Sequence, residues 1–83
     1  MSDIECLVFL PEKQQTYQYV SHVAVATESG DMDIYADHAD CFAAITDGDV
    51  RIVNADRTVE TIHVKEGGCY FSQNRLVLFV SSQ

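Results

Sequence analysis

Proline and glycine are scarce in this chain, with one Pro and four Gly among 83 residues. So few of them leave no room for a flexible or Pro-rich linker between domains. A chain of this length forms one small domain, near the size at which a single core only just suffices. Because 47% of the residues are hydrophobic, we expect a packed core rather than disorder. The prediction is one domain over residues 1–83.

Basic side chains are also few, with 5 Lys and Arg against 13 Asp and Glu, a net charge of −8. Nucleic acids and anionic membrane surfaces would repel such a chain, so we expect neither as a partner. No Lys or Arg lies between Lys13 and Arg51. That window is either a solvated edge or a docking surface for a basic partner, and its acids are Glu28, Asp31, Asp33, Asp37, Asp40, Asp47 and Asp49.

Long hydrophobic runs and a disulfide framework are lacking as well. The apolar run at residues 76–80 is far too short to span a bilayer. The first residues carry acids where a signal peptide would be basic. Three cysteines without a repeated spacing predict free thiols in a reducing compartment. We therefore expect a soluble, cytoplasmic protein, and if it meets a membrane complex, we expect the contact to be peripheral.

Short runs of β-branched and aromatic residues, separated by turn signals, dominate what the chain does contain. Nine such segments occur, with turns spaced roughly 8–12 residues apart. This pattern predicts an all-β sandwich or barrel, and we expect a small β-sandwich of about nine to ten short strands. "ESGD" at 28–31 and "DGD" at 47–49 are assigned to turns, and Gly67-Gly68 to a tight turn or a bulge. Residues 38–45 are the one place where a helical turn competes. The candidate turn glycines are Gly30, Gly48, Gly67 and Gly68.

The stretch "GDMDIYADHADC" at residues 30–41 is rich in side chains that could ligate a metal ion. A calcium loop starting at Asp31 fails, because Tyr35 and Phe42 occupy its fifth and twelfth positions. His38 and Cys41 could chelate zinc, but a structural site needs four ligands and no second pair is present. No nucleophile motif or phosphate-binding glycine loop occurs either. We expect no metal, no cofactor and no catalytic residue, with a stand-alone metal-binding domain kept as an alternative.

The longer stretch "GDMDIYADHADCFAAITDGDVRI" resembles the signature of the epsilon subunit of F-type ATP synthases, called delta in mitochondria. That signature runs Gly-Glu-apolar-Gly-Ile-apolar-Pro-Gly-His-Ala-Pro, followed by a later glycine. Gly30 and Asp31 match its first two positions, His38 its histidine and Gly48 its later glycine. Departures occur at Asp33, Ala36 and Asp40, and "DCFAAI" is similar to the sodium-type branch of the family.

The resemblance covers nearly the whole chain. "VKEGGCYFSQNRLVLFV" looks like the family's Gly-Gly strand, turn and final strand, and "LVFLPEKQQTYQYVSHVAVATESG" fits its opening hairpin. Most members continue into a C-terminal helical hairpin that inhibits rotation and in some bacteria binds ATP. Since this chain stops at Gln83, where the sandwich would end, we do not carry those properties over.

The resemblance implies a non-catalytic subunit of the central stalk, clamped to the gamma subunit and to the polar loops of the membrane c-ring. Because the family's c-ring loops carry an Arg, the acidic stretch is expected to face them. Asp31 and His38 are the best-matched contacts, with Asp33 and Asp37 beside them. The candidates for the gamma-facing surface are Tyr70, Phe71 and Phe79, because exposed apolar patches mark interfaces. The alternative is that these three side chains belong to the hydrophobic core. A small structural or dimerisation domain remains the second alternative.

Overall fold

The computed structural model describes residues 3–83, and these residues form six β-strands. The same residues contain no helix long and apolar enough to cross a bilayer. The all-β prediction is confirmed, whereas the predicted nine to ten short strands become six in the described chain. The strands are β1 (Ile4–Phe9), β2 (Gln14–Thr27), β3 (Gly30–Tyr35), β4 (Cys41–Asn54), β5 (Val59–Ser72) and β6 (Arg75–Ser82).

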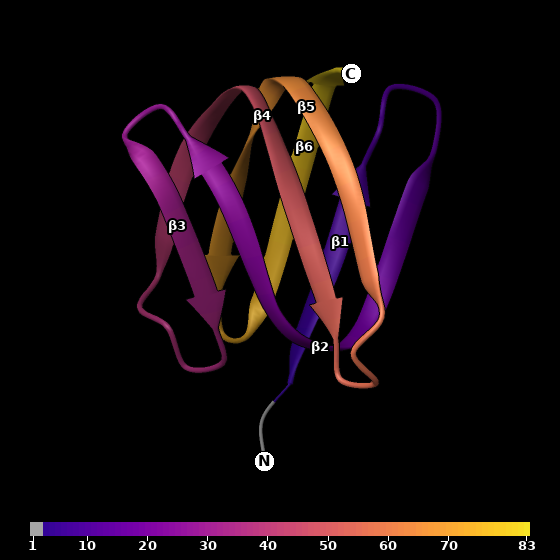
Figure 1. Cartoon of the computed structure of the whole chain (residues 1–83), viewed down its shortest axis with the longest axis vertical. Coiled ribbons are helices and arrows are strands. Elements are labelled where there is room, and N and C mark those ends of the chain that lie inside the picture. Colours follow the sequence, from indigo (N-terminus) through magenta and orange to yellow (C-terminus); the bar gives the residue numbers. More distant parts are fainter. Residues whose placement is uncertain (1–2) are drawn as a thin grey trace.

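Three of the strands, β2, β4 and β5, are 14 residues long and bend through both layers of the sandwich. Figure 1 shows the antiparallel strands β4 and β5 arching together over one end of the molecule, so that each strand has one half in each layer. Each bend has a local irregularity. Tyr19 and Asp47 have φ values of 57° and 53°, and the pairing of β5 with β6 shifts between Glu66 and Gly67. The sequence pattern predicted two short strands in place of each of these long ones.

The buried positions change parity at these bends, which explains the miscount. In β4, Ile45 is buried and the next buried side chain is Val50, five residues on. In β5, the same step separates Val64 from Cys69. A regular strand alternates with a period of two, so an odd step interrupts the pattern and suggests two separate strands.

Two predicted turns were therefore wrong. "DGD" at 47–49, including Gly48, lies inside β4, and Gly67 and Gly68 lie inside β5. The bulge alternative for the glycine pair fits the register shift beside Gly67. Only Gly30 borders a turn, at the start of β3 with φ 120°. The competing helical turn at residues 38–45 is absent, because β4 begins at Cys41.

The strands follow the order β1-β6-β5-β4-β2-β3, and an additional pairing of β1 with β2 closes five of them into a ring. β1 and β6 are parallel, and the other pairs are antiparallel. β3 attaches to the outer edge of β2, where Ile34 faces Val23. The ring encloses one core, and its most completely buried large side chains are Phe71, Ile4, Ile34, Ile45, Ile52, Leu76 and Leu78. No polar side chain of residues 3–83 is buried with it.

A substitution at Gly67 tests the bend in β5. A Cβ at Gly67 would collide with the carbonyl oxygen of Phe79 on β6, whereas a Cβ at Gly68 would lie 3.1 Å from the carbonyl oxygen of Ala43. We expect Gly67→Ala to lower the free energy of unfolding by about 2–3 kcal/mol, as overpacking against a rigid backbone does. Gly68→Ala is the matched control and should cost less. Urea titration of both variants measures the difference, and equal losses would contradict the close approach of β5 and β6.

Candidate functional site

The outer face of the layer made by β1, β6, β5 and β4 carries a continuous patch of apolar side chains. Strand pairing aligns Leu7 with Val77, Val77 with Tyr70 and Tyr70 with Phe42, so one apolar row crosses all four strands. A second row begins with Phe9 and Phe79, whose rings stack with centroids 5.6 Å apart. We call these residues the apolar face: Leu7, Phe9, Phe42, Tyr70, Val77 and Phe79.

Two of the three residues predicted to face gamma lie on this surface. Tyr70 is 47% exposed and Phe79 51% exposed. Phe71 is instead fully buried in the core. The prediction that it faces gamma was therefore wrong, and the alternative that it is a core residue is correct. Neighbouring residues of one strand point to opposite sides of the sheet, and Tyr70 and Phe71 therefore cannot both reach the surface.

Sequence reasoning missed the most exposed member of the apolar face. Phe42 is 83% exposed at the start of β4, and Leu7 and Phe9 also point outward from β1. The signal was the alternation in "CFAAI", where Phe42 and Ile45 fall on opposite faces. This alternation alone does not show which of the two faces of β4 is buried. The buried face follows from the change of parity between Ile45 and Val50.

The outer face of the other layer is acidic. Asp31 and Asp33 on β3 pair with Ala26 and Ala24 on β2. Ala24 also pairs with Arg51 on β4. The small alanine side chains leave a shallow groove between the charged walls. We call this surface the acidic groove, and its residues are Ala24, Val25, Ala26, Asp31, Asp33, Asp49 and Arg51.

The structure does not bring all four predicted c-ring contacts together. Asp31 and Asp33 lie on β3, whereas Asp37 and His38 lie in the loop that follows it. A strand of six residues is about 20 Å long at roughly 3.3 Å per residue, so Asp31 and His38 stand near opposite ends of β3. The predicted surface consequently divides into the acidic groove and the loop of residues 36–40.

This loop is held by several hydrogen bonds. The backbone N–H of His38 donates to the carbonyl of Tyr35 at 3.1 Å, and ring Nδ1 donates to the carbonyl of Ala39 at 2.7 Å. The imidazole also meets the buried ring of Phe71 edge-on, with centroids 5.9 Å apart. His38 is therefore anchored on the core while it remains partly exposed.

His38 and Cys41 do approach each other, with Nδ1 and Sγ 3.9 Å apart. Within residues 3–83, no group of three or more His, Cys, Asp or Glu side chains is placed to hold a metal ion. Burial raises the pKa of the Cys41 thiol, and it raises the pKa of Cys6 to about 12 and of Cys69 to about 11. These thiols are therefore protonated at neutral pH, while metal ligation and nucleophilic attack require the thiolate.

One titratable cluster adjoins the acidic groove. His63 on β5 lies between two aspartates of β4, with Nδ1 2.8 Å from Asp49 and Nε2 3.0 Å from Asp47. Both ring nitrogens can donate to carboxylates only in the imidazolium form. The pKa of His63 is therefore raised from 6.5, chiefly by the hydrogen bond to Asp49. When protonated, His63 places a positive charge beside a carboxylate of the groove.

Stability should depend on the protonation of His63. Because its pKa in the folded state lies above 6.5, the stabilisation is fully present below about pH 6.5 and is lost as pH rises through the raised pKa. Chemical denaturation across this range should show a decline that is smaller in His63→Gln. His22→Gln leaves both aspartate contacts in place and is the control for the loss of a histidine elsewhere. An identical slope in His63→Gln would contradict the assignment.

The fold and its two outer faces define the class of protein, a small β-sandwich whose surfaces suit contacts with other proteins. A sequence model of the family described as the ATP synthase Delta/Epsilon chain, beta-sandwich domain, matches residues 3–82. The chain belongs to this family, and the family prediction made from the sequence is confirmed. No curated protein matches the chain by direct sequence comparison.

Solved structures share the fold at low sequence identity. A chain of the Euglena gracilis mitochondrial ATP synthase (OSCP/F1/c-ring, rotational state 1) superposes with a TM-score of 0.90 at 10% identity over 99% of this chain. A chain of the Tetrahymena thermophila mitochondrial ATP synthase central stalk and c-ring gives 0.79 at 13% identity over 98%. The present chain spans 52% and 65% of their lengths, respectively.

Proposed function

We propose that this chain is a non-catalytic rotor subunit in the central stalk of an F-type ATP synthase, where it links the gamma subunit to the c-ring. The observation that carries the proposal is the contrast between the apolar face on one layer and the acidic groove on the other. Family membership and the similar chains of ATP synthase assemblies support the same assignment. Such a subunit is peripheral to the membrane, on its cytoplasmic side in a bacterial cell.

The apolar face suits the gamma subunit. Large aromatic side chains exposed together on a flat sheet are costly in water and commonly mark a protein interface. Phe42, Tyr70 and Phe79 are each about half exposed or more, and strand pairing brings them onto neighbouring strands. A rigid sheet presents them without ordering a loop, which reduces the entropic cost of binding.

The acidic surfaces suit the polar loops of the c-ring. Three carboxylates and one guanidinium line the groove, so its local charge is negative. In this family the facing c-ring loops carry an Arg, and complementary charge steers association and fixes register. His38, on the loop of residues 36–40, would extend the contact beyond the groove.

The test is co-expression with the gamma subunit and c-ring of the same organism, followed by size-exclusion chromatography. The proposal expects a stable complex that contains one copy each of this chain and gamma, and that also retains the c-ring. Separate elution of well-folded proteins would overturn it. Elution of this chain alone as a dimer would favour the alternative of a small dimerisation domain that buries its apolar face against a second copy.

Phe42 tests the gamma-facing surface. Because its ring is 83% exposed, Phe42→Ala should leave the unfolding free energy within about 0.5 kcal/mol of wild type. We expect affinity for gamma, measured by calorimetry, to fall about 10- to 30-fold if the ring is a central anchor. Tyr19→Ala removes another exposed aromatic, outside the apolar face, and should change the affinity less than about 2-fold. Equal effects of the two variants would argue against this surface.

Asp31 and Asp33 test the groove. Replacing either with Lys removes one attraction to a c-ring Arg and adds a repulsion, so we expect affinity for purified c-ring to fall about 3- to 10-fold at low salt. The loss should shrink as salt screens the charges. Glu12→Lys, in the exposed loop between β1 and β2, makes the same charge change and should have little effect. Unchanged c-ring binding in both aspartate variants would contradict the role of the groove.

A further inference from the structure

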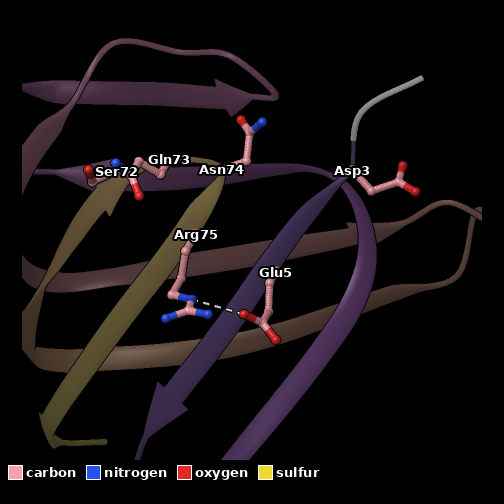
Figure 2. Close-up of a pocket in the computed structure, with 6 residues that line it drawn as sticks. All are labelled: Asp3, Glu5, Ser72, Gln73, Asn74 and Arg75. Carbon is pink, nitrogen blue, oxygen red and sulfur yellow. Dashed lines mark hydrogen bonds and ion pairs between the residues drawn. The ribbon is translucent and has the colours of Figure 1, made fainter.

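Three segments far apart in the sequence meet at one end of the sandwich, where the loop of residues 36–40, the β5–β6 turn and the start of β1 lie close together. Figure 2 shows the turn and the start of β1, with the carboxamide of Asn74 pointing away from the ion pair of Glu5 and Arg75. In that pair, Arg75 Nε donates to Glu5 Oε1 at 2.9 Å. The ion pair fixes β1 against β6 beside the turn.

Asn74 contacts both of the other segments. Its backbone carbonyl accepts a hydrogen bond from the N–H of Glu5 at 3.0 Å. Its side-chain Oδ1 accepts from the backbone N–H of Asp37 at 2.6 Å, and its Nδ2 donates to Asp37 Oδ1 at 3.2 Å. The carboxamide therefore uses its acceptor and a donor on a single residue of the loop, 37 positions away in the sequence.

The backbone conformations on both sides make this contact demanding. Gln73 and Asn74 have φ values of 51° and 58°, as a tight two-residue hairpin turn requires. Asp37 has φ 66°, a left-handed conformation that is unusual outside glycine, although Asp and Asn tolerate it better than most residues. The two hydrogen bonds from Asn74 offset the cost of this conformation and orient the next residue, His38.

We propose that Asn74 is the positioning residue of the loop of residues 36–40, holding Asp37 so that His38 is presented to the c-ring. Asn74 then acts through Asp37, and Asp37 has a positioning role in place of the direct c-ring contact expected for it from the sequence. The inference rests on the proposed function, because it assigns the loop to the c-ring.

Asn74→Gly tests the proposal with little disturbance of the turn, because glycine accepts positive φ without strain. Gln73→Gly is the matched control, since it adds the same backbone freedom to the same turn and leaves the Asn74 carboxamide in place. In the isolated chain, amide hydrogen exchange at Asp37 and His38 should accelerate at least about 10-fold in Asn74→Gly and stay near wild type in the control.

The partner measurement uses purified c-ring in detergent and, separately, gamma. Asn74→Gly should weaken c-ring binding about 5- to 10-fold and leave gamma binding within about 2-fold, because two hydrogen bonds to one loop are lost while the apolar face is intact. The double variant Asp37→Asn with Asn74→Asp exchanges the two side chains and keeps the net charge. The new amide at position 37 can then donate to the new carboxylate at position 74. It should recover most of the c-ring affinity.

The possible failures can be told apart. A wild-type chain that does not bind the c-ring would overturn the proposed function, and the c-ring role of the loop with it. If the wild-type chain binds and the two glycine variants weaken binding equally, the rigidity of the turn rather than the Asn74 carboxamide matters, and the inference is wrong. Faster loop exchange in Asn74→Gly with unchanged c-ring affinity would also overturn it.

Discussion

The structure depends on the continuity of β2, β4 and β5 through their bends. Each strand serves both layers, so a single core is shared by the two sheets of a domain with only 83 residues. A chain this small cannot bury enough apolar surface in two separate cores. The bends at Tyr19, Asp47 and Gly67 are therefore conditions of the fold. The close approach of Gly67 to β6 shows how little space the bend in β5 allows.

The bends also determine the chemistry of the surfaces. β4 and β5 stay in register across the bend, with Val50 opposite Ile62 before it and Cys69 opposite Ala43 after it. Because the buried parity changes in both strands together, their outward residues change together as well. Asp49 and His63 consequently face outward in the acidic layer, while Phe42 and Tyr70 face outward in the apolar one. The same two strands thus carry opposite chemistry on the two outer faces of the domain.

The loop after β3 depends on contacts outside its own sequence. His38 rests on the core through Phe71, and Asp37 is tied to the β5–β6 turn through Asn74. A loop fixed in this way loses little conformational freedom on binding, so less interaction energy is spent on ordering it. In the proposed function, the loop would therefore offer a partner a preformed surface, as the rigid sheet faces would.

The sequence by itself determined the fold class, the family and the sign of the surface charge. Short β-branched and aromatic runs separated by turn signals predicted an all-β sandwich or barrel, and Gly30, His38 and the later glycines identified the family. The inferences on fold class and family succeeded because they rest on local pattern, composition and spacing. Asp31, Asp33, Tyr70 and Phe79, which the sequence indicated as partner contacts, are exposed in the structure, and their contacts with a partner stay predictions.

Only the tertiary structure decided the number of strands, the placement of Phe71 in the core and of Phe42 outside it, and the separation of His38 from Asp31. These features depend on where strand parity changes and on pairings between distant residues. A local pattern shows an interrupted alternation but does not distinguish a bend inside one strand from a turn between two strands. The contact between Asp37 and Asn74 likewise spans 37 positions, and it forms only when folding brings the ends of β3 and β5 together.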